Sequence, residues 1–317
     1  MVAKIFIDGE AGTTGLQIRD RLAARYDIQL LSLDNEHRKD RSARQDALNS
    51  ADVAILCLPD DAARESVTLI ESETTKVIDA STAHRTDPDW TYGFAEMAEG
   101  HDAVIAESKR VSNPGCYPQG LIATIRPLID EGFFSPDSLI SMNAISGYSG
   151  GGRKMIEQYE AAGAKAVPYL PYGLSFEHKH LPEMTVYSGL KRAPLFQPAV
   201  GNYAQGMLTL VPLHYDLLPE GMTGARIHTV LRDRFTGTGF VDVAPLNAIN
   251  QPAELDPQAL NSTNLMRLFV FANDQNGQMV VAALYDNLGK GASGAAVQNL
   301  NLMLGCNVNE SLGAKAA

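Results

Sequence analysis

The sequence predicts an α/β protein that begins with a doubly wound parallel sheet. The run AKIFIDG is a short apolar strand closed by Gly9, and a glycine-containing turn and an amphipathic helix follow it directly. Further strand-like runs, DIQLLSLD, DVAILCLP and KVIDAS, alternate with helix-like segments, which is typical of a parallel sheet covered by helices. The middle of the chain then carries more strand-like runs, which predict a separate domain: LISMNAIS, GMLTLVPLHY, ARIHTVLRD, LMRLFVFA and QMVVAALYD.

Composition limits the function classes that fit. The chain has 317 residues, of which 45% are hydrophobic and 20% are charged, so it can build one large or two ordinary globular cores. Its net charge of -11 argues against a general nucleic-acid or membrane-surface binder, although a local basic pocket for an anionic substrate remains compatible with it. No apolar run is long enough for a membrane span.

The beginning of the chain and its cysteines indicate a compartment. The opening MVAKIFIDGEAG enters a strand at once and lacks the pattern of a secretory signal. Three widely spaced cysteines without a CxxC pair make a disulfide framework or a zinc site a poor fit, and we expect no bound metal. We therefore expect a cytoplasmic protein in a reducing environment.

The first turn predicts a dinucleotide site. Its glycines have the spacing GxxGxxG between a strand and a helix, where glycine lets the backbone bend tightly and approach a pyrophosphate at the helix N-terminus. Hydroxyl donors stand beside them. The expected phosphate-binding residues are Gly9, Gly12, Thr13, Thr14 and Gly15.

The choice between NAD and NADP rests on the stretch that follows the second strand. Asp34 stands where an acidic residue can bind a ribose hydroxyl, which would favour NAD. However, Arg38, Lys39 and Arg41 follow at once, and such cations can bind a 2′-phosphate. These signals oppose each other, and we expect NADP, with Arg38 as its ligand.

The segment VSNPGCYPQG indicates a nucleophile. Cys116 precedes the apolar run LIATIRPLIDEGFF, and Pro118 suits the first turn of a helix. A helix N-terminus stabilises a thiolate, and its backbone N–H groups can hold an oxyanion formed when the sulfur attacks a carbonyl. Cys57, inside a strand-like run, and Cys306, near the end of a predicted helix, are expected to be structural.

A nucleophilic cysteine needs a proton-transfer partner, and YGLSFEHKHLPEM is the distinctive candidate. Its His178 and His180 share a face on a strand but diverge on a helix. If a helix begins near Lys179, one histidine can face the sulfur, and His180 and Glu183 lie on one helical face. A metal site or a purely structural role are the alternatives for this motif.

Together these motifs resemble the N-acetyl-gamma-glutamyl-phosphate reductases, in their shorter form. The resemblance covers essentially the whole chain, and the cysteine and HxHLPEM segments make it specific. It is carried by the glycine opening, DASTAHRTDPDWTYGF, SNPGCYPQG, SGYSGGGRKM, EHKHLPEM and DNLGKGASGAAVQNLNLM.

The resemblance implies a fold like that of aspartate-semialdehyde dehydrogenase. It implies a Rossmann-type NADP-binding domain over residues 1–115 and 290–317, onto which the last helix packs. It further implies an α/β substrate and dimerisation domain with a mixed, largely antiparallel sheet over residues 116–289. Homo-oligomers, dimers or tetramers, are expected from the family.

The resemblance also implies the reaction. Cys116 attacks the acyl phosphate, phosphate leaves, and NADPH reduces the resulting thioester to the semialdehyde in arginine biosynthesis. His178 is the first choice for proton transfer, with His180 and Glu183 in support. Arg85 is expected to bind the substrate phosphate, because arginine offers a planar fork of donors; a surface arginine is the alternative. The remaining expected contacts are Asn113, Gln119, Ser146 and Arg153 for the substrate, and Asn287, Gly291 and Ala292 for the cofactor.

Three other functions fit parts of the pattern. A reductase of another acyl phosphate, such as aspartyl phosphate, would keep every motif. A cysteine hydrolase would need the cysteine and histidine but no dinucleotide. A nucleotide-sensing protein without enzymatic activity would need the glycine turn but no reactive thiol.

Overall fold

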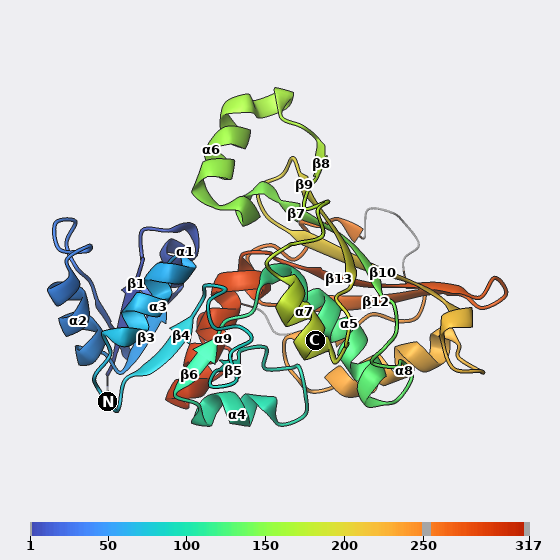
Figure 1. Ribbon diagram of the computed structural model, residues 1–317, viewed down its shortest axis with the longest axis horizontal. Coiled ribbons are helices and arrows are strands. Elements are labelled where there is room, and N and C mark those ends of the chain that lie inside the picture. The colour runs from blue at the N-terminus through green and yellow to red at the C-terminus, as the bar shows by residue number, and fades with distance from the viewer. Residues whose placement is uncertain (1, 249–254, 314–317) are drawn as a thin grey trace. The chain divides into compact units, whose positions relative to one another are not determined.

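The computed structural model describes residues 2–248 and 255–313 (Figure 1). The chain forms two compact units. Unit 1 comprises Met1–Ala95, Gly100–Gly115 and Ala292–Gly313, and unit 2 comprises Glu96–Glu99 and Cys116–Gly291. The chain therefore passes from one unit to the other directly before Cys116 and directly after Gly291.

Unit 1 is built on a parallel sheet, which we call sheet A. In the described residues its strand order is β2-β1-β3-β4-β6-β5, and all neighbouring strands pair in parallel. The order reverses on either side of β1, as in a doubly wound sheet. The strands are β1 (Ala3–Asp8), β2 (Ile28–Leu31), β3 (Val53–Leu56), β4 (Lys76–Asp79), β5 (Thr91–Tyr92) and β6 (Arg110–Ser112).

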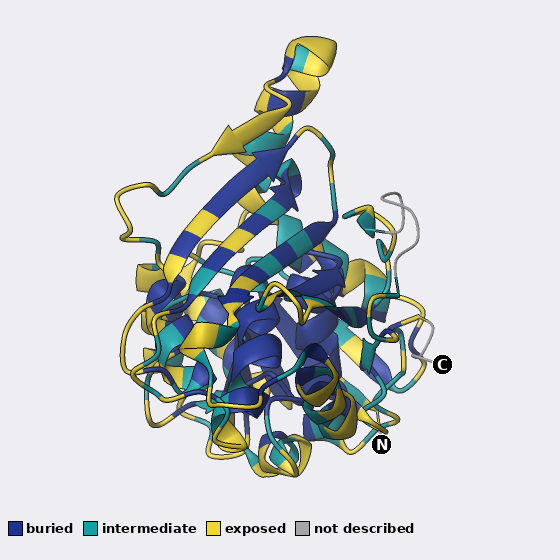
Figure 2. Ribbon diagram, turned by 90° about the vertical axis from the view of Figure 1, so that its right-hand side faces the viewer, coloured by how far each residue is buried: buried dark blue, intermediate teal, exposed yellow. Residues whose placement is uncertain are grey.

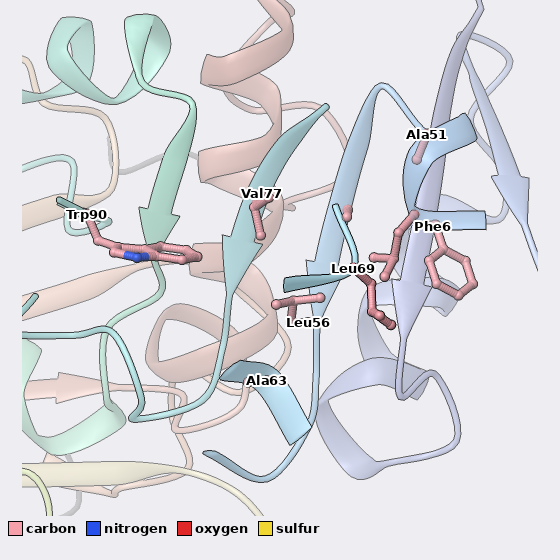
Figure 3. Close-up of a cluster of buried hydrophobic side chains, with 9 residues drawn as sticks. Phe6, Ala51, Leu56, Ala63, Leu69, Val77 and Trp90 are labelled. Atoms are coloured by element: carbon pink, nitrogen blue, oxygen red, sulfur yellow. The ribbon is translucent and has the colours of Figure 1, made fainter. Parts of the chain in front are cut away.

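Both faces of sheet A are buried. One face carries a hydrophobic cluster in which Phe6, Leu56 and Val77 of the strands pack with Leu48 of α2 and Ala63 of α3 (Figure 3). The alternate strand residues point to the other face, and helix α9 contacts β4, α1 and α4. The helices of unit 1 are α1 (Thr13–Leu22), α2 (Arg41–Ser50), α3 (Asp60–Thr68), α4 (His101–Glu107) and α9 (Gly294–Leu304).

Unit 2 is built on a mixed sheet, which we call sheet B. Across the described residues its order is β11-β12-β13-β10-β7-β9-β8, with parallel pairing at β11–β12 and β7–β9 and antiparallel pairing elsewhere. Its strands show alternating buried and more exposed bands (Figure 2). They are β7 (Ser141–Gly147), β8 (Tyr169–Pro171), β9 (Leu195–Gly201), β10 (Met207–His214), β11 (Val241–Val243), β12 (Met266–Asn273) and β13 (Gln278–Tyr285).

Helix α5 (Cys116–Asp130) is the central helix of unit 2. It contacts β10 and β13 of the sheet as well as α7 (Leu181–Ser188) and α8 (Gly224–Phe235). Most of its residues are buried, as its nearly continuous apolar sequence predicts. Helix α6 (Gly152–Ala162) and the edge strand β8 are mostly exposed (Figure 2). Short 3₁₀ turns occur at Tyr148–Gly151, Gly163–Lys165 and Tyr215–Leu217.

The strand expected over ARIHTVLRD is wrong, because this segment lies in helix α8. The Thr223 side chain accepts a hydrogen bond from the Arg226 N–H (3.3 Å) and caps the helix. Ile227, Leu231 and Phe235 recur every four residues and are all buried, which is a helical period. The β-branched residues within the segment suggested a strand, but this spacing and the cap outweigh their propensity.

The structure confirms the predicted fold class: a Rossmann-type parallel sheet in one unit and a mixed, largely antiparallel sheet in the other. No helix within the described residues is long and apolar enough to cross a membrane.

Candidate active site

The glycine turn of unit 1 is tightly closed. Gly9 has φ +91, and a Cβ there would lie 2.4 Å from the carbonyl oxygen of Cys57. A Cβ on Gly15 would lie 2.6 Å from the Gly9 carbonyl oxygen. Only glycine therefore fits at these two positions without a shift of backbone, and the turn brings the start of α1 close to the end of β1.

The start of α1 suits an anion. The helix begins at Thr13 and is preceded by Gly12 in extended conformation, and it has no acidic residue in its first turn. Thr13 and Thr14 are partly exposed. Backbone N–H groups and the positive end of the helix dipole can hold a phosphate here. The predicted glycine and threonine residues are therefore brought together at one helix terminus.

The stretch after β2 contains the opposing signals for NAD and NADP, and in the structure Asp34 is hydrogen-bonded within its own loop. The Asp34 carboxylate accepts hydrogen bonds from the backbone N–H groups of Glu36 (3.0 Å) and His37 (2.9 Å), and from His37 Nδ1 (2.8 Å). These bonds, that from the His37 backbone first, lower the pKa of Asp34. One carboxylate oxygen thus organises its own loop, while Arg38 is exposed beside it.

Arg85 is buried rather than on the surface. It is 8% exposed, and its Nε and Nη2 donate to the carbonyl oxygens of Asn113 (3.0 Å) and Ala80 (3.3 Å). The neighbouring His84 donates from Nδ1 to Asp79 (2.6 Å) and stacks on Trp90 at 4.2 Å. The guanidinium plane is therefore fixed by backbone carbonyls of two loops, one after β4 and one after β6.

Asn113 is a buried cross-link within unit 1. Its Nδ2 donates to the Ala292 carbonyl (3.0 Å), and its Oδ1 accepts from Asn299 Nδ2 (3.2 Å). These bonds attach the residues after β6 to the start of α9. The structure thus brings together Asn113 and Ala292, one expected substrate ligand and one expected cofactor ligand.

Cys116 is the first residue of α5. Its carbonyl oxygen accepts a hydrogen bond from the buried Tyr285 hydroxyl (2.6 Å). Its side chain borders Gly291, where a Cβ would lie 2.9 Å from the Cys116 Cβ. Helix α5 therefore begins at the cysteine, one residue earlier than expected, and two other segments of unit 2 fix the backbone and side chain of this residue.

An aromatic box surrounds the histidine pair. The His178 ring lies 4.7 Å from the His180 ring, 5.2 Å from Phe196, 5.8 Å from Tyr172 and 6.1 Å from Tyr117. The Tyr172 hydroxyl donates to that of Tyr117 (3.2 Å).

Cys116 is close to this box. Tyr117 directly follows Cys116 in α5, and the Tyr117 ring lies 6.1 Å from the His178 ring and 6.0 Å from the His180 ring. The cysteine, the histidines and the tyrosines therefore form one cluster within unit 2.

His178 is held in a defined state. The His180 backbone N–H donates to His178 Nδ1 (3.1 Å), so the neutral ring carries its proton on Nε2. Burial lowers the pKa of His178 to about 4, with a smaller contribution from the charge of Lys179. The ring is therefore neutral near pH 7 and can donate a hydrogen bond from Nε2.

The HxH motif precedes a helix, as expected. His180 is the N-cap residue of α7, and the helix begins at Leu181. His180 is 6% exposed and Glu183 is 1% exposed, so both are buried, whereas His178 is partly exposed. The described residues contain no cluster of three or more potential metal ligands.

The remaining expected ligands lie in different settings. Gln119 is buried, and its Nε2 donates to the Lys290 carbonyl (2.8 Å). Ser146 is buried and donates to the Gly147 carbonyl (3.1 Å). Asn287 is buried between the Gly206 N–H (2.7 Å) and the Ser149 hydroxyl (3.0 Å). Arg153 is exposed and pairs with Glu157 (2.9 Å) on α6.

The other two cysteines, Cys57 and Cys306, differ from Cys116 in their surroundings. Cys57 follows the last residue of β3 instead of lying inside the strand, which corrects its expected position, and burial raises its pKa to about 12. Cys306 follows α9, and burial also raises its pKa. Neither thiol is set up to ionise near neutral pH, in agreement with a structural role.

The tyrosines of the site were not predicted from the sequence. Tyr117 directly follows the cysteine, so its position in SNPGCYPQG was an available signal. Tyr172 and Tyr285 come from distant parts of the chain, and nothing in their local sequence marks them. Their roles depend on contacts across 55 and 169 residues of sequence, respectively.

Two family models match the chain. The semialdehyde dehydrogenase NAD binding domain matches residues 13–104, and the semialdehyde dehydrogenase dimerisation domain matches residues 116–287. The solved structure of aspartate semialdehyde dehydrogenase II from Vibrio cholerae, complexed with ASA, covers 96% of this chain and 98% of its own, at a TM-score of 0.70 and 14% identity. The enzyme from Candida albicans with NADP covers 97% and 100%, at a TM-score of 0.65 and 15% identity. The fold and the family models together define a semialdehyde dehydrogenase.

Curated relatives narrow this class. An N-acetyl-gamma-glutamyl-phosphate reductase from Chelativorans sp. is 58% identical over 96% of this chain and 99% of its own. Proteins of the same name from Mesorhizobium japonicum and Burkholderia cenocepacia are 57% and 54% identical, over 96% and 95% of this chain and 100% and 97% of their own. The chain belongs to the N-acetyl-gamma-glutamyl-phosphate reductase family, as the sequence motifs predicted.

Proposed function

We propose that this protein reduces N-acetyl-gamma-glutamyl phosphate to N-acetyl-glutamate semialdehyde and phosphate, with NADPH, in arginine biosynthesis. The observation that carries the proposal is the position of Cys116 at the start of α5 within a cluster that includes a neutral histidine. The names of the relatives at 50–58% identity support the substrate.

Cys116 is the nucleophile in this proposal. Its sulfur attacks the acyl carbon, the C–O bond to phosphate breaks, and an acyl thioester forms on the cysteine. The positive end of α5 stabilises the attacking thiolate, and N–H groups at this helix end can hold the oxygen of the attacked carbonyl. A thioester suits the reaction because it accepts hydride more readily than an oxygen ester would.

The residues of unit 1 fit a dinucleotide. Adding a side chain at Gly9 or Gly15 would fill the turn that phosphates must approach, and α1 presents an uncapped N-terminus. Gly12, Thr13 and Thr14 would hold the pyrophosphate. When bound, NADPH supplies the hydride that brings the thioester carbonyl to the aldehyde oxidation level. Arg38 would hold the 2′-phosphate, and Asn287, Gly291 and Ala292 would border the nicotinamide.

His178 stabilises the oxygen of the reacting carbonyl. Since the neutral ring carries hydrogen on Nε2, it can donate a hydrogen bond to the negatively charged oxygen that would follow hydride addition, while the proton stays on the ring. The carbonyl forms again from this oxygen as the C–S bond breaks, so the aldehyde is released and the cysteine sulfur leaves as thiolate. The His180 backbone fixes the His178 tautomer, and buried Glu183 supports the first turn of α7.

Arg85 binds the substrate phosphate in this scheme. Its Nε and Nη2 are already engaged by backbone carbonyls, which fixes the plane in which the guanidinium meets an anion. Substitution by alanine should raise the phosphate KM of the reverse reaction, and an unchanged value would contradict the role. Further substrate contacts are proposed for Asn113, Gln119, Ser146 and Arg153.

The two parts of the chain have separate tasks. Residues 1–115 and 290–317 bind NADP, and residues 116–289 bind the substrate and supply subunit contacts in a cytoplasmic homodimer or homotetramer. The description of the family model matched by residues 116–287, a dimerisation domain, supports the second task. Light scattering coupled to size-exclusion chromatography tests the oligomer, and a mass equal to one chain of 34.2 kDa would contradict it.

The reverse reaction tests the proposal as a whole. The purified protein is mixed with N-acetylglutamate semialdehyde, phosphate and NADP⁺, and NADPH formation is followed by absorbance, with Cys116→Ser as the matched variant. We expect phosphate-dependent NADPH formation that the variant loses. Activity with aspartate semialdehyde alone would show that the proposed substrate is wrong. Full activity of Cys116→Ser would show that Cys116 is not the nucleophile.

A further inference from the structure

Two consecutive backbone positions in unit 2 border the first turn of α5. Gly291 packs against the Cys116 side chain, where even one added carbon would lie 2.9 Å from the Cys116 Cβ. The carbonyl of Lys290 accepts the hydrogen bond of Gln119 Nε2 at 2.8 Å. A displacement of residues 290–291 would therefore move the cysteine and the side chain three residues after it.

These two positions belong to an unusual backbone segment. Gly289–Ser293 forms a π-helical turn, and the Gly291 N–H donates to the Asp286 carbonyl (2.8 Å), five residues earlier. Such turns are rare and occur frequently at functional sites. The backbone geometry next to Cys116 thus depends on contacts from outside the turn.

The Lys290 side chain supplies such a contact. Its Nζ lies 2.8 Å and 2.7 Å from the two carboxylate oxygens of Glu96, and both residues are buried, at 1% and 4% exposure. The ammonium also lies 5.7 Å from the centre of the Phe240 ring. Because these atoms are fully removed from water, the pair fixes both position and orientation of the lysine.

Glu96 is itself anchored in unit 2. The four residues Glu96–Glu99 belong to this unit although their neighbours on both sides belong to unit 1. Arg234 of α8 donates to the Met97 carbonyl (3.4 Å), and Met97 is buried. The carboxylate therefore projects from a segment that is attached to the helical layer of unit 2.

Stability alone is a poor reason for such a pair. Removing two charges from water costs about as much as their attraction returns, and apolar residues of similar volume often stabilise a protein as well or better. Neither residue has a part in the proposed chemistry. A pair of this kind is useful where one particular arrangement of the surrounding backbone is required.

We propose that the Lys290–Glu96 ion pair is a positioning device for the Cys116 nucleophile. It holds the π-helical turn, so that Gly291 and the Lys290 carbonyl set the place of the sulfur and of the first turn of α5. This inference rests on the proposed role of Cys116. Both residues act through the turn and neither touches the reacting atoms.

The test replaces both charges at once. The double variant Glu96→Leu, Lys290→Met removes the pair without leaving a buried charge, so it should fold with a melting temperature close to or above that of the wild type. We expect the iodoacetamide alkylation rate of Cys116, measured by mass spectrometry between about pH 5 and about pH 10, to fall roughly tenfold or more. The kcat of the reverse reaction should fall by a similar factor, with the NADP⁺ KM unchanged.

Arg25→Met is the matched control. Arg25 is also buried in an ion pair, with Asp27 at 2.6 Å, but lies in unit 1. This variant should lower the melting temperature and leave Cys116 alkylation unchanged. If the double variant does not fold, Glu96→Gln keeps an acceptor for Lys290, and a reduced alkylation rate in this folded variant carries the same conclusion.

The positioning role of the ion pair and the nucleophilic role of Cys116 are distinguished by different variants. The positioning role is overturned if the folded double variant keeps the wild-type alkylation rate and kcat. If the double variant does not fold, the same result in folded Glu96→Gln overturns it. In either case Cys116→Ser would still be inactive. If Cys116→Ser keeps phosphate-dependent NADPH formation, the proposed nucleophile is wrong, and the positioning inference is overturned with it.

Discussion

His178 offers a prediction whose size follows from the structure. Burial, together with the charge of Lys179, lowers its pKa from 6.5 to about 4. A histidine that resists protonation in the folded state makes folding less favourable as pH falls, since the unfolded chain binds the proton more readily. The stability is therefore complete above about pH 6.5 and is lost progressively between about pH 6.5 and about pH 4.

The magnitude can be bounded. The two values differ by about 2.5 pH units, which corresponds to ~3.4 kcal/mol at about 1.36 kcal/mol for each pH unit. Because the ring is partly exposed, solvent screens the effect, and we expect about half of this value, ~1.5 kcal/mol. Replacing His178 by Asn retains an acceptor for the His180 N–H, so the variant should lose this part of the pH dependence with little other damage.

Two measurements check this reasoning. Urea unfolding at about pH 7.5 and about pH 5 should show a smaller loss of stability for His178→Asn than for the wild type. NMR of protein labelled in its histidines should contain one ring, absent in the variant, that titrates near pH 4 and is protonated on Nε2 when neutral. Lys179→Gln should raise this midpoint. A His178 ring that titrates at or above its ordinary value of 6.5 would refute the argument.

Three further predictions concern packing and reactivity. Gly15→Ala should destabilise the protein by about 1–3 kcal/mol in urea unfolding, because the new carbon would lie 2.6 Å from a carbonyl oxygen. Gly12→Ala should reduce the stability less, because the atom nearest to its new carbon is 3.5 Å away. Equal losses of stability in the two variants would contradict the steric explanation. At about pH 8, iodoacetamide should label Cys116 and leave Cys57 unmodified, since burial raises the pKa of Cys57 to about 12; equal labelling in peptide mass spectra would count against this. Tyr285→Phe removes the hydrogen bond to the Cys116 carbonyl and should cost about 1 kcal/mol; unchanged unfolding would show that this bond contributes nothing.

The fold was accessible from local sequence patterns. Alternating apolar runs and helices predicted the parallel sheet, and the glycine spacing predicted the turn at Gly9–Gly15, because both depend on neighbouring residues. Helix α8 was missed because Ile227, Thr229 and Val230 favour strands, whereas its burial pattern and its Thr223 cap are helical. Local propensity was here outweighed by packing, as is common for short segments.

The candidate site could be predicted only in part. Cys116 and the HxH motif stand out because their residue types are chemically distinctive, and the structure places Cys116 directly before Tyr117, a member of the aromatic box around His178. Their roles in the reaction stay predictions. Pairs such as Lys290 and Glu96, separated by 194 residues, leave no signal in a single sequence, since neither partner is unusual in its own segment.

Glycines at the start of α5 show how such long-range requirements are nevertheless written into the chain. Gly120 lies inside a buried helix, where glycine costs roughly 1 kcal/mol relative to alanine. A Cβ there would lie 2.5 Å from Thr209 Oγ1 and 2.8 Å from the Tyr285 hydroxyl. Gly291 meets Cys116 in the same way from another segment. The helix that carries the nucleophile therefore lies closer to β10 and β13 than any side chain would allow, and its intrinsic weakness at Gly120 is offset by the contacts that fix Cys116.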